Sequence, residues 1–178
     1  MATSAAPSQR HSEHLSGQGA IDKVRGLLDH FRSAMLTTVV QDQLHTRPMG
    51  LLGEASEFNG SLYFFTRDDS PNVRDLERGA AASLIFQCDK ESAYMQLSGH
   101  AAEYRDKAKM QELFTPLIGT WFPDGLNDPH LTLIRFDAEA GHFWESPGGM
   151  IQVLAAFTRT RLTGRPARGG VSGDVQLS

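Results

Sequence analysis

Hydrophobic residues near the start of the chain recur every three or four positions, as on a helix with one buried face. These residues are Ile21, Val24, Leu27, Leu28 and Phe31. The spacing predicts an amphipathic helix over residues 19–32 that packs against a core.

After this helix the pattern changes to short apolar and β-branched runs, which are typical of strands. Residues 34–40 and 45–54 form two such runs around a polar turn at 41–43, which predicts a hairpin. Asn59-Gly60 is a turn signal, because both residues tolerate positive φ, and a third strand is predicted after it at 61–66. We therefore expect an antiparallel sheet from its start.

The remainder of the chain mixes further strands with short helices. Ser70, Pro71 and Gly79 have the order of a helix cap, a first helical position and a helix end. Helices are predicted at 70–79, at 106–120, where Pro116 must kink or end the helix, and at 147–157. Strands are predicted at 80–87, 92–104, 131–136 and 142–145, with turns at 88–91 and 137–141.

This order of elements predicts a β-dominated α+β fold, a small antiparallel barrel of six to seven strands with peripheral helices. Residues 1–17 are small and polar and are predicted to be a disordered tail. The domain is expected over residues 18–158. Four arginines between positions 159 and 168 indicate a basic, flexible C-terminal tail over 159–178.

The composition narrows the class of protein. The 178 residues carry a formal net charge of −4, so the chain as a whole has no basic excess that would attract nucleic acid or an anionic membrane. Its single cysteine, Cys88, cannot form an intramolecular disulfide and fits a reducing compartment. No apolar run approaches the roughly 20 residues of a spanning helix. We expect a cytoplasmic, single-domain protein.

The common catalytic and nucleotide-binding motifs are missing, and the histidines are scattered, so no metal site is predicted. Several short motifs at strand ends suit an anionic, planar ligand instead. Arg47-Pro48-Met49 places a guanidinium beside a rigid strand edge, and Phe65-Thr66-Arg67 adds a hydroxyl and a second guanidinium. Ser70 and Asn72 open the short helix, whose first amides favour a phosphate.

These motifs, in this order, resemble the general stress protein type of FMN-binding split barrel, which is related to pyridoxamine 5′-phosphate oxidase. The resemblance covers residues 20–165. It includes Thr-Arg-Pro-Met, Leu-Tyr-Phe-Phe-Thr, Ser-Pro-Asn-Val-Arg-Asp-Leu, Leu-Ser-Gly-His-Ala, Trp-Phe-Pro-Asp-Gly-Leu-Asn-Asp-Pro and Phe-Trp-Glu.

The resemblance implies a homodimer of split barrels with FMN in two grooves at the interface. One subunit would contribute Arg47, Pro48, Met49, Phe65, Thr66, Arg67, Ser70, Asn72 and Val73. The opposite subunit would contribute Gln96, Ser98 and Trp121, the last on a loop where its flat face could cover the flavin ring, a role that Trp144 could share. The family often has lysine where this chain has Asn72, so another arginine would have to replace that charge.

Two functions follow from the resemblance. The first is a flavin-dependent oxidoreductase that uses NADH or NADPH, since the cofactor supplies the hydride chemistry. The second is a stress protein that binds or senses flavin without turnover. A groove for a deazaflavin or haem is a third reading, and it requires His45 or His100 to face the groove.

Overall fold

The computed structural model describes residues 12–70, 73, 76, 80–145 and 171–178. The predicted helix at 147–157 and Asn72 lie outside these residues, as does most of the predicted helix at 70–79. The described strands are β1 (Ser12–Ser16), β2 (Ser33–Val40), β3 (Gln43–Gly50), β4 (Ser61–Arg67), β5 (Ala80–Cys88), β6 (Ala93–Tyr104), β7 (Leu131–Glu145) and β8 (Val171–Gln176). The described helices are α1 (Gly17–Leu28), η1 (Ala55–Glu57), α3 (Lys107–Leu113), α4 (Pro116–Gly119) and η2 (Gly125–Asn127).

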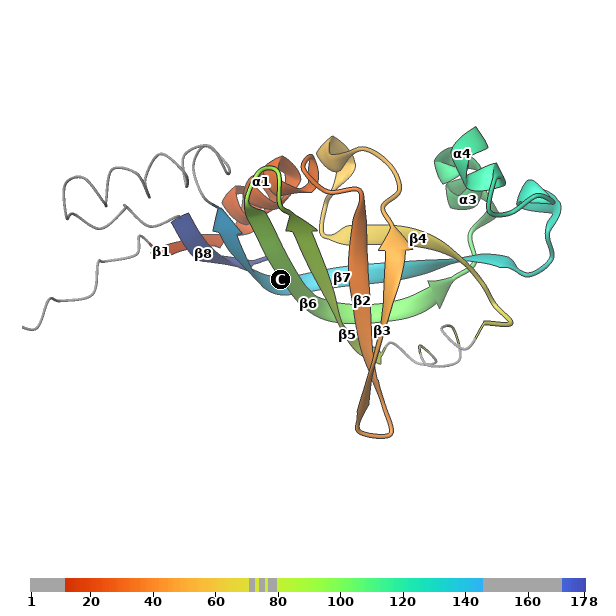
Figure 1. Cartoon of the computed structure of the whole chain (residues 1–178), viewed down its shortest axis with the longest axis horizontal. Coiled ribbons are helices and arrows are strands. Elements are labelled where there is room, and N and C mark those ends of the chain that lie inside the picture. The colour runs from red at the N-terminus through yellow and green to blue at the C-terminus, as the bar shows by residue number, and fades with distance from the viewer. Residues whose placement is uncertain (1–11, 71–72, 74–75, 77–79, 146–170) are drawn as a thin grey trace, which may run out of the picture.

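The strands form one mostly antiparallel sheet in the order β1-β8-β7-β6-β5-β2-β3, and β4 pairs with β7 (Figure 1). Helix α1 lies near one end of the sheet, and α3 and α4 lie near the other. The β-dominated class is therefore confirmed, but the described residues contain eight strands rather than six or seven. None of the described helices is both long and apolar enough to span a membrane.

Local signals located the first elements well. Helix α1 buries Ala20, Val24, Leu27 and Leu28, as the spacing predicts, although it ends four residues early. The β2–β3 hairpin is confirmed, and its turn places Gln41 and Asp42 at φ of 48° and 61°, the left-handed pair of a tight hairpin. The predicted helix at 106–120 divides into α3 and α4, because Pro116 begins a new helix.

The prediction of two final strands separated by a turn at 137–141 is wrong. These residues belong to one fifteen-residue strand, β7, which pairs with β6 from Leu133 to Glu145. On its other edge β7 pairs first with β4 and then with β8. The register with β6 shifts at Gly99, where a Cβ would lie 1.9 Å from the carbonyl oxygen of Asp137, so only glycine fits there.

The predicted disorder of residues 1–17 and flexibility of residues 159–178 are wrong where the structure describes them. Residues 12–16 form β1 and residues 171–176 form β8, and the two strands pair in parallel. Leu15 and Val175 pack toward the core, and Asp174 on β8 contacts His14 on β1 and His142 on β7. Short polar strands of this kind cannot be recognised in the sequence until the strands that pair with them are known.

The two faces of the sheet differ in character. Side chains of directly paired residues point to the same face. The inner face packs a core around Phe64, Phe86, Phe136 and Phe143. On the opposite face, here called the outer face, Met35 lies between Pro48 and Ile85 in register, and Ile85 is followed across the sheet by Gln96 and His142.

Candidate functional site

Arg47 lies on β3 and points toward the inner side of the sheet. Its Nη2 donates a hydrogen bond of 3.1 Å to Oγ1 of Thr38, which is fully buried. Pro48 projects to the outer face and is exposed, whereas Met49 is buried. The three predicted residues are therefore divided between two faces, and a ligand on the inner side would contact Arg47 without the Pro48 ring.

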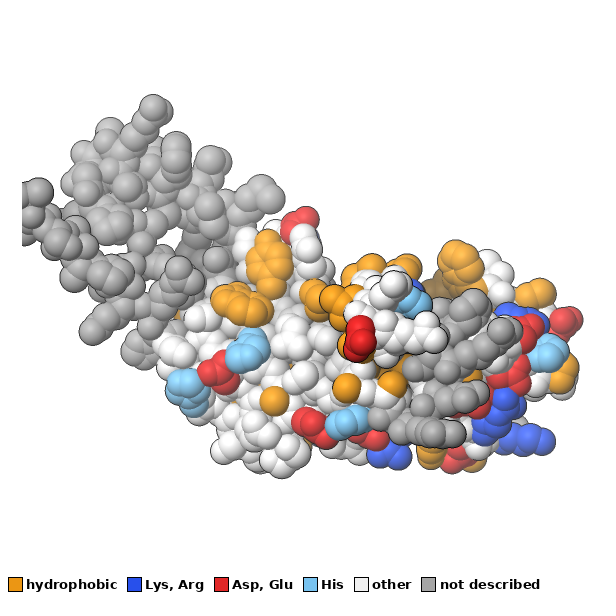
Figure 2. Space-filling view, turned by 90° about the horizontal axis from the view of Figure 1, so that it is seen from below, with side chains coloured by type: hydrophobic (Ala, Val, Ile, Leu, Met, Phe, Trp, Pro, Cys, Tyr) orange, Lys and Arg blue, Asp and Glu red, His pale blue; other side chains and the backbone are white. Residues whose placement is uncertain are grey.

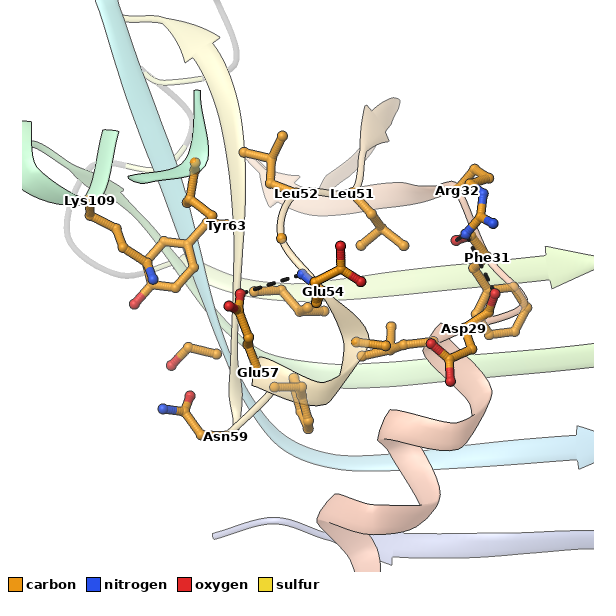
Figure 3. A pocket seen from close by; sticks show the side chains of 17 residues that line it. Asp29, Phe31, Arg32, Leu51, Leu52, Glu54, Glu57, Asn59, Tyr63 and Lys109 are labelled. Carbon is orange, nitrogen blue, oxygen red and sulfur yellow. Dashed lines mark hydrogen bonds between the residues drawn. The ribbon is translucent and has the colours of Figure 1, made fainter. Parts of the chain in front are cut away.

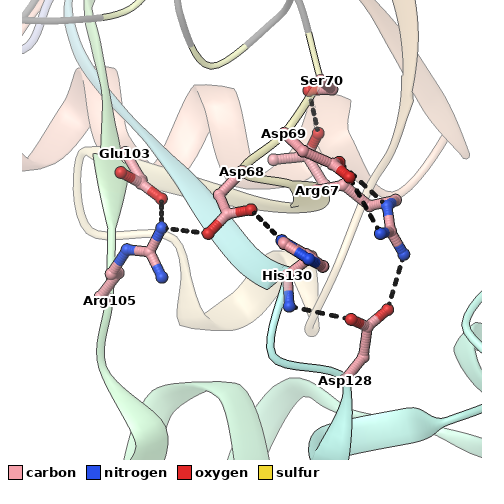
Figure 4. Close-up of polar contacts among 9 residues, drawn as sticks. Arg67, Asp68, Asp69, Ser70, Glu103, Arg105, Asp128 and His130 are labelled. Carbon is pink, nitrogen blue, oxygen red and sulfur yellow. Dashed lines mark hydrogen bonds and ion pairs between the residues drawn. The ribbon is translucent and has the colours of Figure 1, made fainter.

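Thr66 and Ser70 come together at the end of β4. Thr66 is buried, and its Oγ1 lies 3.5 Å from Oγ of Ser70, so the two hydroxyls form a small polar pair (Figure 4). The Ser70 carbonyl accepts from the Val73 amide at 3.2 Å. The Val73 side chain itself is only 6% exposed, so this residue contributes packing rather than a ligand contact.

Phe65 faces away from this polar pair, because neighbouring residues of a strand point to opposite faces. Its ring packs against Phe114 at a centroid distance of 5.8 Å and against Phe122 at 6.2 Å. The described contacts of Phe65 therefore pack it against the segment that carries α3 and α4. The prediction had placed Phe65 along the cofactor.

The prediction that Arg67 binds phosphate is not supported, because carboxylates already surround its guanidinium. Asp69 accepts from Nε at 3.0 Å and from Nη2 at 3.1 Å, and Asp128 accepts from Nη1 at 2.8 Å (Figure 4). The hydrogen bond from Arg67 lowers the pKa of Asp69, and the same contact raises the pKa of Arg67. Arg67 joins the end of β4 to the segment before β7.

A second group of charges continues this network. Asp68 accepts from Arg105 at 2.5 Å and contacts Nδ1 of His130 at 2.8 Å, and Arg105 also pairs with Glu103 at 2.8 Å (Figure 4). These contacts, with that to Arg105 the largest, lower the pKa of Asp68. Counting Asp69 and Asp128, four carboxylates face two guanidinium groups. A phosphate nearby would therefore depend on Arg47, hydroxyls and backbone amides.

Gln96 and Ser98 lie on β6 and point to the outer face, opposite to Arg47. Gln96 Nε2 donates to Ser83 Oγ at 2.9 Å, and Ser98 Oγ donates to the Ala140 carbonyl at 3.2 Å. One chain therefore holds Arg47 and Thr66 on one face of its sheet and Gln96 and Ser98 on the other. This is the arrangement expected if the groups act together only across two subunits.

Large exposed hydrophobic side chains gather in two places among the described residues. Met35, Val39, Leu44, Ile85, Tyr94 and Trp144 lie on the outer face. Figure 2, which views the molecule from below, shows hydrophobic side chains on the surface next to histidine and carboxylate side chains. The second group, Leu117, Trp121 and Leu126, lies in the segment from α4 to η2.

Trp121 is 80% exposed, and its amide donates to the Ile118 carbonyl at 2.9 Å as the chain leaves α4. The prediction that Trp121 lies on a loop is confirmed. Packing against the core does not explain this residue, and an exposed indole is suited to covering a flat ligand or a partner.

A cleft of about 380 Å³ lies between α1, the η1 segment, β4 and α3 (Figure 3). Its lining includes Leu51 and Leu52, and Asp29, Glu54 and Glu57 bring carboxylates to it. None of the eleven predicted ligand residues that the structure describes lines this cleft. Arg32 and Lys109 also line the cleft, but three carboxylates outnumber these two cations, and we do not assign the cofactor to it.

Sequence reasoning missed two threonines beside the predicted ligands. Thr38 accepts a hydrogen bond from Arg47, and Thr132 on β7 lies directly opposite Thr66. The only sequence signal for either is a hydroxyl within an apolar strand, and the pairing of β4 with β7 could not be read from the sequence.

Comparison with known proteins agrees with this geometry. A family model described as "Pyridoxamine 5'-phosphate oxidase like" matches residues 19–167. Protein bli-3 of Neurospora crassa is 25% identical over 122 residues, which cover 64% of this chain and 58% of that protein, so the match spans little more than half of the relative.

Among solved structures, a general stress protein 26 from Jannaschia sp. CCS1 superposes with a TM-score of 0.73 at 22% identity, over 87% of this chain and 96% of that one. The general stress FMN/FAD binding protein of Xanthomonas citri is 26% identical, with a TM-score of 0.63 over 72% of this chain and 90% of that one. A haem-binding protein from Mycobacterium smegmatis shares the fold at 12% identity and a TM-score of 0.56, over 75% of this chain and 56% of that one.

Proposed function

Because this chain belongs to the pyridoxamine 5′-phosphate oxidase-like family, we propose that it binds FMN at the interface of a homodimer of split barrels. The observation that carries the proposal is the division of the ligand residues. Arg47, Thr66 and the inner side of the sheet form one half of the site, and Gln96 and Ser98 on the outer face form the other.

The outer face is the proposed dimer surface. Its exposed hydrophobic residues include Met35 and Ile85, and Ile85 lies directly beside Gln96 in register. A second copy is the occupant we infer, because a two-fold dimer pairs the same patch of both subunits, and β3, which carries Arg47, is the edge strand of the sheet and lies beside this patch. Exposed apolar area of this kind is stabilised when a partner excludes water from it.

The residues present fit a flavin phosphate and ring. Arg47 would hold the phosphate by a charge-assisted hydrogen bond, and Thr66 and Ser70 would donate their hydroxyl hydrogens to it. Trp121 of the partner subunit would cover the ring and exclude water. Asn72 is neutral where the family often has lysine, and carboxylates surround Arg67, so we propose Arg47, beside its bond to Thr38, as the main cation at the phosphate.

The proposal extends to a flavin-dependent oxidoreductase that is reduced by NADH or NADPH. When bound, FMN supplies hydride and electron transfer, and the protein's own residues bind, orient and shield the ring. Flavin binding without turnover, as in a sensor of the cofactor, is the alternative. The X. citri relative, a stress protein whose name gives it flavin binding, supports both readings equally. The single cysteine is consistent with a cytoplasmic location, which is part of the proposal.

Visible absorption of the protein purified without added ligand, with mass identification of what heat releases, tests the cofactor. Released FMN supports the proposal, and a porphyrin would support the haem reading. For haem, His100 on the outer face is the better placed of the two histidines named above, and Glu139 holds its Nδ1 at 2.9 Å. Anaerobic bleaching of the flavin by NADH or NADPH would separate the oxidoreductase from a binding protein.

A further inference from the structure

Thr132 carries a buried hydroxyl that contributes no hydrogen bond to the described part of the fold. Its residue is fully buried on β7, and Oγ1 has no hydrogen-bond partner among the residues that the structure describes. An unsatisfied buried hydroxyl is costly, and native proteins retain few of them. The position is therefore one where the protein forgoes stability for another purpose.

The location of Thr132 indicates that purpose. Thr132 is directly opposite Thr66 in the β4–β7 register, so the two side chains point to the same face. The preceding pairs on that face are apolar, Phe64 with Ile134 and Leu62 with Phe136. Two buried threonines thus end an otherwise hydrophobic row, next to Ser70.

We propose that Thr132 is a positioning residue for the phosphate of the cofactor, acting through Thr66. The two hydroxyls are not hydrogen-bonded in the ligand-free chain, and in this arrangement a bound phosphate draws them together. The Thr132 O–H then donates to Oγ1 of Thr66, and the Thr66 O–H donates to a phosphate oxygen. The inference rests on the proposed function, because it takes the phosphate to be that of FMN.

The chain of donors explains why a hydroxyl is retained in this place. A hydroxyl can donate only one hydrogen, and the contact between Thr66 and Ser70 is long at 3.5 Å, so Thr66 has weak local competition for its hydrogen. When Thr66 donates to an anion, its oxygen becomes a better acceptor, which strengthens the bond from Thr132. The benefit arises only when a phosphate is present.

Thr132 would therefore help the protein distinguish FMN from riboflavin, which has the same ring and no phosphate. This contribution matters because Arg67 is already paired with Asp69 and Asp128, and Asn72 carries no charge.

The test is a pair of flavin titrations, with FMN and with riboflavin, on the full chain and three variants. Thr132→Val keeps the shape and removes the hydroxyl, whereas Thr132→Ser keeps the hydroxyl. Thr115→Val is the matched control, because Thr115 is exposed and its side chain makes no cap hydrogen bond. Melting temperature of the flavin-free protein is measured in parallel.

We expect Thr132→Val to weaken FMN binding about five- to tenfold, the value of one neutral hydrogen bond, and riboflavin binding less than twofold. Thr132→Ser should retain FMN affinity, and Thr115→Val should change neither. The flavin-free Thr132→Val protein should melt no lower than wild type, because the substitution removes a buried hydroxyl that has no hydrogen-bond partner. Loss of affinity without loss of stability is a result that a purely structural role does not give.

An unchanged ratio of FMN to riboflavin affinity in Thr132→Val would overturn the inference while leaving the proposed function in place. A wild-type protein that does not prefer FMN over riboflavin would refute the phosphate site itself, and both proposals would then fail. A melting temperature of Thr132→Val well below wild type, with equal loss of both affinities, would identify Thr132 as a packing residue only.

Discussion

Replacement of Ile85 by aspartate is the sharpest perturbation of the proposed dimer. Ile85 lies in the middle of the outer face, between Met35 and Gln96 in register, and it is 48% exposed in the single chain. Because its side chain stands on the exposed face and not in the core, the monomer should tolerate a carboxylate there and remain folded.

The expected magnitude follows from that exposure. Full burial of an isoleucine side chain contributes about 1.5–3 kcal/mol, so the exposed half of Ile85 would contribute about 1 kcal/mol in each subunit. A two-fold dimer loses this contribution twice, about 2 kcal/mol, which corresponds to about a 30-fold rise in the dimer dissociation constant. Burying two carboxylates adds several kcal/mol, so the combined rise should exceed about 1,000-fold.

Sedimentation velocity across a range of protein concentrations measures this effect, with flavin content read from the same samples. We expect the Ile85→Asp protein to sediment as a folded monomer and to lose its flavin, because the two halves of the site separate. Gln111→Asp is the control, since Gln111 is exposed on α3, outside that face and outside the group around Trp121. An Ile85→Asp protein that remains dimeric and flavin-loaded would refute the assignment of this face.

Three further variants test individual residues. Arg47→Met should weaken FMN binding about tenfold or more and riboflavin binding less than twofold, since a charge-assisted hydrogen bond to phosphate is lost; equal losses in fluorescence titrations would contradict this. Arg67→Met should lower the melting temperature and leave FMN affinity unchanged. Because folding lowers the pKa of Asp69, the stability from this pair is present above the unfolded carboxyl value of about 3.9 and disappears as pH falls through the lower folded value, so the difference from wild type should shrink in acid. Trp121→Ala should weaken FMN binding without changing the melting temperature, and a collapse of stability with unchanged affinity would show instead that Trp121 packs in the interior.

Local sequence signals predicted what depends on neighbours along the chain. The spacing of Val24 and Leu27 located α1, and the polar turn at Gln41 and Asp42 located the first hairpin. Each of these features is encoded within a few residues. The same holds for the loop at Trp121, where glycine and proline interrupt the helical pattern.

Pairing between distant segments could not be predicted in this way. Strands β1 and β8 are short and polar, and each is stabilised by a partner that lies far away in the sequence. Residues 137–141 look like a turn, yet they continue β7 because β6 pairs with the chain on both sides of the register shift there. Arg67 looked like a phosphate ligand because the carboxylate of Asp128, sixty-one residues away, is invisible to local reading.

In the proposed homodimer, the two halves of each flavin site come from different subunits. The most direct test of this arrangement is to mix two defective proteins, Arg47→Met and Gln96→Ala, under conditions in which subunits exchange, and to titrate FMN. Each homodimer has both of its sites damaged, whereas a mixed dimer contains one site with wild-type Arg47 and wild-type Gln96. After random exchange of subunits, we expect mixing to restore tight FMN binding to about one quarter of all sites. Binding that never exceeds that of the separate variants would show that each chain forms its own site.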